Sequence, residues 1–292
     1  MILHLRYLPI IILVSSIILL SACSEPKKPA IDIEGKENFR FFSKNVKDSF
    51  SISVQLPLEY LEYPEMKYPV VVVTDANFYF PMLGPVLHQY QKGGLLPPLI
   101  LVGVGYKSLK EMDSLRVRDF MYPAVLPSDE MKTSGGGLNF YRFLTKEILP
   151  KIHASYRTDK SKSTLLGHSF GGYFSMLALL QQTKEKTNYS SDFVSASPSL
   201  WYNNFYLKQL HEKLMQSASK DSLNILLTVG EVEEYKWSVK PVKEFSKQFY
   251  DIKPNNVEFN TQVYSHLDHM DVGLISFTKG LQRFYNKPQG AD

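Results

Sequence analysis

The chain has one cysteine, Cys23, among its 292 residues. A single cysteine excludes internal disulfide bonds and any metal site built from several thiolates. The sequence also lacks a strong charge of one sign, because 33 lysines and arginines nearly balance 29 aspartates and glutamates, for a formal net charge of +4. With no basic tract to neutralise a phosphate backbone, we expect no nucleic-acid partner.

The amino terminus has an apolar run, but a short one. The run at residues 8–20 follows His4 and Arg6 and falls short of the roughly 20 residues that a bilayer-spanning helix needs. A positive start, a short apolar stretch and small residues at its boundary are typical of an export signal. Residues 20–23 (Leu-Ser-Ala-Cys) resemble the bacterial lipobox, in which the cysteine becomes the lipid-modified first residue of the mature protein.

We therefore expect a lipoprotein signal peptide over residues 1–22, a lipid anchor on Cys23 and a flexible tether over residues 23–36. Ser24 follows the cysteine, which favours anchoring to the outer membrane on its periplasmic side. The alternative is an uncleaved anchor helix with an incidental cysteine. Both interpretations attach the protein to a membrane outside the cytoplasm.

The rest of the chain is rich enough in apolar residues, at 44 % of the whole sequence, to form a folded core. Period-2 and continuous apolar patterns alternate with helical ones. This alternation predicts a single α/β domain over residues 37–287, with a mostly parallel central sheet and helices on both faces. The expected strands are residues 50–56, 68–74, 99–104, 163–166, 193–196, 223–229 and 257–264, and the expected helices are 138–156 (interrupted at Pro150), 171–181, 204–215, 239–250 and 269–285.

Residues 167–172 read Gly-His-Ser-Phe-Gly-Gly and contain the pattern G-x-S-x-G around Ser169. An expected strand precedes them and an expected helix follows, which is the context of a nucleophile elbow. Glycine suits the flanking positions because side chains there would collide with the neighbouring strand and helix. The serine hydroxyl would project at a helix N-terminus, where the dipole favours a developing oxyanion. The motif indicates a serine nucleophile, and the alternative is a tight glycine turn without chemistry.

A serine nucleophile needs a base, and the base needs an acid that orients it. The α/β-hydrolases supply these groups in the chain order Ser, Asp/Glu, His. Here an acidic loop follows the expected strand 223–229, and a histidine-containing loop follows the strand 257–264. We predict Glu233 as the acid and His269 as the base.

Three other carboxylates compete for the role of the acid. Glu231 lies too close to the end of its strand, and Glu234 is the nearest competitor. Asp268 adjoins His269, and neighbouring side chains in an extended segment point in different directions.

The same loop raises the possibility of a metal site, because His266, Asp268, His269 and Asp271 lie close together in sequence. A hydrolytic zinc site needs further ligands from other loops. The sequence offers no matching second cluster, so we expect neither a metal nor another cofactor.

With these residues in place, the sequence from about residue 39 to 285 resembles the esterase family of α/β-hydrolases that includes enterobactin (siderophore) esterases and feruloyl-type carbohydrate esterases. The elbow GHSFGG followed by SPSLW at residues 197–201 is similar to the siderophore-esterase branch. Further landmarks of the resemblance are residues 68–80, 116–119, 135–137, 143–150 and 156–159.

The resemblance implies an oxyanion hole made by the backbone N–H groups of Phe170 and Asn77. The family usually has Asp-Gly where this chain has Asp75-Ala76, so we expect a slightly different position of the oxyanion loop. The acid varies across the family, and some members work as a Ser–His pair.

The resemblance also implies a small-molecule ester substrate, with a siderophore of the catecholate trilactone type as the leading expectation. Trp201 is a candidate wall for a catechol ring, and Arg116 and Arg118 are candidates to meet an anionic substrate. The alternative is that both arginines are structural, one of them pairing with Asp119. A feruloyl or acetyl sugar ester, or a non-catalytic binding lipoprotein with the same fold, remain the competing functions.

Overall fold

The computed structural model describes residues 35–129, 133–217, 219, 221–251 and 254–286. The predicted signal peptide, the lipid attachment at Cys23 and all but the last two residues of the predicted tether lie outside the described residues. No helix in the described part of the chain is long and apolar enough to cross a membrane.

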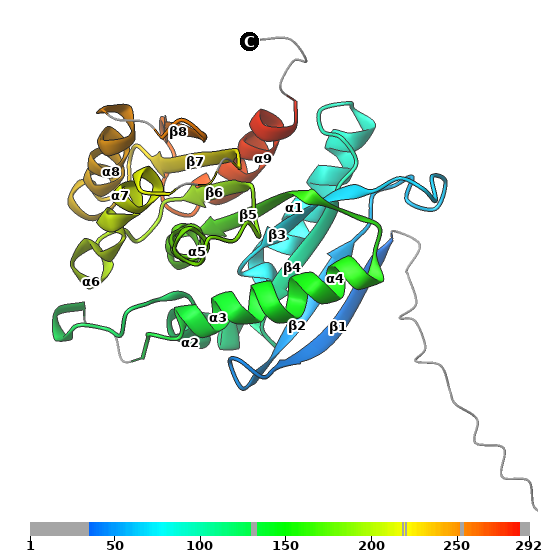
Figure 1. Ribbon diagram of the computed structural model, residues 1–292, viewed down its shortest axis with the longest axis horizontal. Helices are drawn as coiled ribbons and strands as arrows, with labels where there is room; N and C mark the ends of the chain where they lie inside the picture. The colour runs from blue at the N-terminus through cyan, green and yellow to red at the C-terminus, as the bar shows by residue number, and fades with distance from the viewer. Residues whose placement is uncertain (1–34, 130–132, 218, 220, 252–253, 287–292) are drawn as a thin grey trace, which may run out of the picture.

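The described strands form one sheet of eight, in the order β1-β2-β4-β3-β5-β6-β7-β8 (Figure 1). β1 and β2 pair antiparallel, as do β2 and β4, whereas β3 to β8 all run parallel. The inner strands are buried on both faces, as their runs of Val, Ile and Leu predict. The strands are β1 (Lys36–Ser43), β2 (Asp48–Gln55), β3 (Tyr68–Val73), β4 (Ile100–Gly105), β5 (Thr158–His168), β6 (Asp192–Ala196), β7 (Leu223–Gly230) and β8 (Val257–Tyr264).

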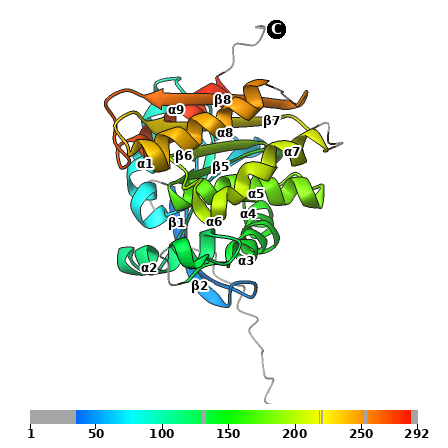
Figure 2. The same cartoon turned by 90° about the vertical axis from the view of Figure 1, so that its left-hand side faces the viewer.

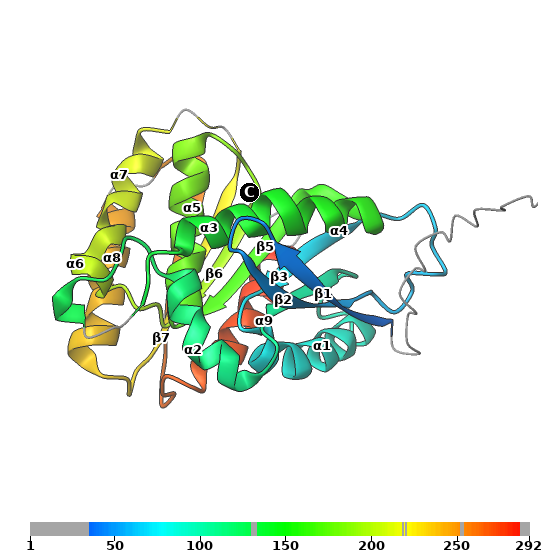
Figure 3. The ribbon, with the colours of Figure 1, turned by 90° about the horizontal axis from the view of Figure 1, so that it is seen from below.

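Helices cover both faces of the sheet, which confirms the predicted fold class. α1 and α9 pack on one face, and α3, α4, α5, α7 and α8 pack on the other (Figure 3). Figure 2 shows α5 and α8 lying in front of the strands. The helices are α1 (Ala76–Lys92), α2 (Leu109–Phe120), α3 (Gly137–Arg142), α4 (Leu149–Ser155), α5 (Phe170–Glu185), α6 (Tyr202–Phe205), α7 (Gln209–Met215), α8 (Lys240–Asp251) and α9 (Val272–Tyr285), with short 3₁₀ turns at Pro127–Asp129 and Tyr206–Lys208 and π turns at Phe143–Ile148 and Tyr235–Val239.

Three elements were not predicted from the sequence. β1 begins at Lys36, inside the predicted tether, and α1 and α2 fill the connections on either side of β4. α1 contains Pro81 and Pro85, residues that normally argue against a helix interior. The helix expected over residues 204–215 is also broken, because Asn204 and Phe205 adopt left-handed backbone angles.

The long helix predicted over residues 138–156 is interrupted near Pro150, as expected. α3 passes into the π turn at Phe143–Ile148, and α-helical bonding resumes at α4, which carries Pro150 in its first turn. Proline has no N–H to donate, so it is tolerated where the regular helix restarts.

Candidate active site

Ser169 occupies the junction between β5 and α5. Its backbone has φ 59° and ψ −117°, a strained conformation for a residue with a side chain. A Cβ atom on Gly167 would lie 1.9 Å from the carbonyl oxygen of Gly171, and one on Gly171 would lie 2.5 Å from Thr74 Oγ1. Both glycines of the motif are therefore required for this turn. Within the described residues the Ser169 hydroxyl has no hydrogen-bond partner.

Glu233 and His269 come together at the same edge of the sheet. His269 Nδ1 lies 2.8 Å from Glu233 Oε2. The Glu233 side chain is buried, whereas the imidazole is 41 % exposed. Because an ionised carboxylate only accepts hydrogen bonds, Nδ1 carries the proton in this contact, and Nε2 of a neutral imidazole is left as an acceptor.

The second carboxylate oxygen of Glu233 is also satisfied. The backbone N–H of Gly230 donates to Glu233 Oε1 over 2.7 Å, and the Ser197 hydroxyl donates to the same atom. Burial raises the pKa of Glu233, but the hydrogen bonds from His269, Ser197 and Gly230 outweigh that effect and lower it below its usual value. Glu233 is therefore ionised at neutral pH.

The competing carboxylates are engaged by backbone amides. Glu231 Oε2 accepts from the N–H of His266 at 3.3 Å, and Glu234 Oε2 accepts from the N–H of Trp237 at 2.5 Å. Asp268 Oδ1 accepts from the amides of two residues that follow it in the turn before α9. Of the four candidate acids, Glu233 is the one whose carboxylate hydrogen bonds to His269.

His168, which precedes Ser169, is a positioning group that the sequence did not indicate. Its Nε2 donates to the carbonyl oxygen of His269 over 2.7 Å, and the centres of the two rings are 4.6 Å apart. The ring of Tyr79 packs against its edge. Burial, with a smaller contribution from His269, lowers the pKa of His168 to about 3, so this imidazole is neutral and does not compete as a base.

The two predicted oxyanion donors lie at helix N-termini. Phe170 is the first residue of α5 and Asn77 the second residue of α1, and N–H groups in a first turn have no partner inside their helix. The Asn77 side chain bonds both backbone groups of Tyr106, accepting from its N–H over 2.6 Å and donating to its carbonyl over 2.8 Å. The Asn77 side chain therefore ties the start of α1 to the residue that follows β4.

The methyl group of Ala76, where the family usually has glycine, is accommodated against Gly103. A Cβ atom on Gly103 would lie 2.8 Å from the Cβ of Ala76. The unusual backbone conformation falls one residue earlier, at Asp75, with φ 53° and ψ 40°. Ala76 itself is helical, so it needs no glycine.

Arg116, predicted to meet an anionic substrate, is instead engaged inside the protein. Its guanidinium makes two hydrogen bonds to the Asp75 carboxylate, at 2.9 Å and 2.6 Å. The Arg116 side chain is 15 % exposed and that of Asp75 is 2 % exposed. This geometry favours the structural alternative, and the carboxylate that Arg116 meets is Asp75.

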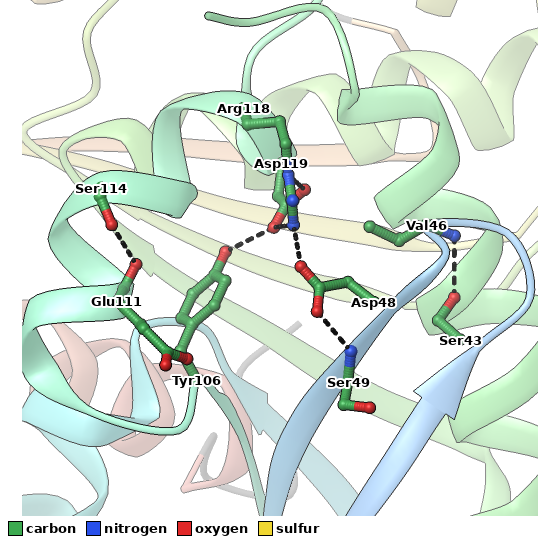
Figure 4. Close-up of polar contacts among 9 residues, drawn as sticks. All are labelled: Ser43, Val46, Asp48, Ser49, Tyr106, Glu111, Ser114, Arg118 and Asp119. Atoms are coloured by element: carbon green, nitrogen blue, oxygen red, sulfur yellow. Dashed lines mark hydrogen bonds and ion pairs between the residues drawn. The ribbon is translucent and has the colours of Figure 1, made fainter.

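Arg118, two residues further along the same helix, is bound by two other carboxylates (Figure 4). It pairs with Asp119 at 2.7 Å and with Asp48 of β2 at 2.9 Å. Tyr106 donates a further hydrogen bond to the Asp119 carboxylate. Arg118 therefore links α2 to the β1–β2 hairpin, and its contacts too favour a structural role.

The predicted substrate wall, Trp201, is half-buried and lies in the segment after β6. The N–H of Ser199 in this segment donates to the carbonyl oxygen of Ser169 over 3.3 Å, so the segment adjoins the elbow. Two aromatic residues that the sequence analysis did not single out follow Glu233 closely. Tyr235 is 61 % exposed and Trp237 is 48 % exposed.

Residues 43–265 match the sequence model of a protein family described as "Putative esterase". The chain belongs to this esterase family. The match covers well over half of the sequence and confirms the resemblance stated from the motifs.

Individual relatives are named as esterases. The chain is 31 % identical to the ferri-bacillibactin esterase BesA of Bacillus subtilis over 219 residues, which make up 70 % of this chain and 73 % of that protein. It is 31 % identical to the apo-salmochelin esterase of Escherichia coli over 145 residues, or 47 % of this chain and 43 % of that one. A solved structure of the BES protein from Bacillus cereus has a TM-score of 0.75 at 25 % identity, covering 89 % of this chain and 97 % of that one.

Proposed function

We propose that the protein is a siderophore-type serine esterase that hydrolyses the ester bonds of a catecholate trilactone through an acyl-enzyme on Ser169. The observation that carries the proposal is the 2.8 Å contact between Glu233 and His269, at the sheet edge where Ser169 occupies its strained turn. The family and the names of the relatives support the ester chemistry and the substrate class.

In the first half-reaction, Ser169 Oγ bonds to the ester carbonyl carbon while His269 Nε2 takes the hydroxyl proton. The carbonyl π electrons move onto oxygen, and the N–H groups of Phe170 and Asn77 stabilise that oxyanion. Glu233 holds the imidazole in the required tautomer and stabilises the imidazolium. When the carbonyl re-forms, the bond to the leaving alcohol breaks and His269 returns the proton to the departing oxygen.

In the second half-reaction, water replaces the alcohol. His269 takes a proton from water as the water oxygen bonds to the acyl carbon, and the bond to Ser169 Oγ then breaks. The serine oxygen recovers its proton from His269, and the carboxylic acid leaves. The cycle needs only groups of this chain and water.

The segment that follows Glu233 carries side chains that suit an aromatic, anionic substrate. Tyr235 and Trp237 are exposed within four residues of Glu233. Lys236 Nζ lies 4.5 Å from the centre of the Trp237 ring, and Lys243 Nζ lies 6.0 Å from that of Tyr235. Aromatic rings flanked by ammonium groups suit the stacking and the charge of catecholates.

The test compares kcat/KM for a cyclic catecholate trilactone with kcat/KM for a feruloylated sugar, using wild-type protein and S169A. We expect faster turnover of the trilactone and no turnover by S169A. Faster turnover of the sugar ester would overturn the substrate assignment. Absence of turnover of both compounds, and of a p-nitrophenyl ester, would identify a binding protein instead.

We also propose that Cys23 carries a lipid anchor to the bacterial envelope, on the strength of the Leu-Ser-Ala-Cys boundary. Gly35 hydrogen bonds to the residue after β2, where β2 lies beside the amino end of β4. The tether therefore joins the domain near the amino end of β4. Ser169 lies at the other end of the parallel strands, after the carboxyl end of β5. Labelled palmitate should enter the wild-type protein and not Cys23→Ala, and label retained in that variant would contradict the anchor.

A further inference from the structure

Arg116 contacts both chain segments that carry the proposed oxyanion donors. Besides its two hydrogen bonds to Asp75, its Nη2 donates to the carbonyl oxygen of His168 over 3.2 Å. Its guanidinium carbon lies 5.1 Å from the centre of the Phe170 ring. One side chain thus connects the end of β3 with the elbow after β5.

These contacts flank the two amides closely. Asp75 precedes Asn77 by two residues and directly precedes α1. His168 and Phe170 are the immediate neighbours of Ser169. A change in the position of Arg116 would therefore alter the separation between the Asn77 and Phe170 N–H groups.

The ion pair also bears on the backbone conformation of Asp75. Asp75 lies in the left-handed region with φ 53°, which aspartate is among the few residues other than glycine to adopt. A planar guanidinium that donates two parallel hydrogen bonds fixes a carboxylate in both position and orientation. Burial lowers the pKa of Arg116, but the Asp75 carboxylate outweighs burial and raises it, so the guanidinium stays charged.

Buried ion pairs often contribute little to net stability, so a merely stabilising role is a weak explanation for this one. We propose that Arg116, together with Asp75, is a positioning residue that sets the geometry of the oxyanion hole. The proposal rests on the proposed serine mechanism. Because an oxyanion forms only in the transition state, loss of the pair should lower kcat and leave KM nearly unchanged.

The experiment compares R116K, R116Q and D75N with the matched control R118Q. Arg118 lies on the same helix and is also paired with carboxylates, but those carboxylates are Asp119 and Asp48. Its link to Asn77 is indirect, through the Tyr106 hydroxyl bonded to Asp119, whereas Arg116 bonds Asp75 and His168 directly. We expect kcat to fall roughly 10- to 100-fold in R116Q and D75N, less in R116K, and less than twofold in R118Q. KM should stay within about twofold throughout, and the rate of inactivation by a serine-directed phosphonate should fall in parallel with kcat.

Thermal unfolding of each variant checks that it folds. If R116Q does not fold, R116K and D75N carry the comparison with R118Q. The combination R116Q/D75N should be no slower than the slower single variant, because both changes break one pair. A kcat within twofold of wild type in R116Q and D75N, or a loss in R118Q as large as theirs, would overturn the proposal. Activity that survives in S169A would instead refute the serine mechanism itself.

Discussion

The two sides of the proposed active site are held by different forces. On the proton-transfer side, formed by Glu233, His269 and His168, hydrogen bonds hold the Glu233 carboxylate against the His269 ring and the neutral His168 imidazole against the His269 carbonyl. On the oxyanion side, formed by the turns that carry Asn77 and Phe170, the Arg116–Asp75 ion pair is the central contact. The first side depends on the directions of individual hydrogen bonds, whereas the second depends on a two-point contact between a guanidinium and a carboxylate.

The largest expected effect comes from removing the Ser169 hydroxyl, because both the proton-transfer side and the oxyanion side act on this group. S169A should lose roughly a thousandfold or more in kcat for ester hydrolysis, because no other hydroxyl occupies the turn. Circular dichroism and thermal unfolding should match wild type, since the serine side chain makes no hydrogen bond within the described residues. A variant that keeps a tenth of wild-type activity would refute the nucleophile.

The next largest effect isolates the proton-transfer side. E233Q should lower kcat roughly a hundredfold or more, because the amide cannot stabilise the imidazolium or fix the tautomer as a carboxylate does. E231Q and E234Q are matched controls and should stay within about threefold, since their carboxylates bond backbone amides. If E233Q also stays within threefold, roughly 0.7 kcal/mol, the enzyme works as a Ser169–His269 pair.

A smaller effect concerns stability and its dependence on pH. His168 has a folded pKa of about 3, against roughly 6.5 when unfolded. Between those values the unfolded chain binds more protons, so stability is fully present above pH 6.5 and falls as the pH drops. Between pH 6.5 and 5 this histidine should account for a loss of roughly 1–2 kcal/mol in the free energy of unfolding.

H168Q tests this because glutamine keeps an N–H donor for the His269 carbonyl but does not titrate. Chemical denaturation at pH 5 and 6.5 should show a smaller pH-dependent loss in H168Q than in wild type, while kcat at neutral pH stays within about tenfold. Equal losses in the two proteins would show that His168 is not a buried neutral group.

The strand-to-helix junctions of the parallel sheet were predictable from the sequence because their signals are local. The Val-rich run of β3, the elbow around Ser169 and the polar loops after β7 and β8 each appear within a few neighbouring residues. α1 was missed because Pro81 and Pro85 argue against a helix, although this one packs its apolar side against the sheet. There, tertiary packing outweighed local propensity.

The partners of the charged residues could not be predicted in the same way. Arg116 pairs with Asp75 across 41 positions of sequence, and Ser197 reaches Glu233 across 36. Nothing in the spacing of Arg116 and Arg118 indicates which carboxylate each one meets. Only the folded chain shows that both arginines are paired with carboxylates of this chain.

The most direct test of the central claim labels the protein with a serine-directed fluorophosphonate and follows both its mass and its hydrolysis of a catecholate trilactone. The account predicts one adduct per chain, located by peptide mass on Ser169, with activity falling in proportion to the labelled fraction and no adduct in S169A. Full trilactone hydrolysis by protein labelled at Ser169, or an inactivating adduct on another residue, would contradict it.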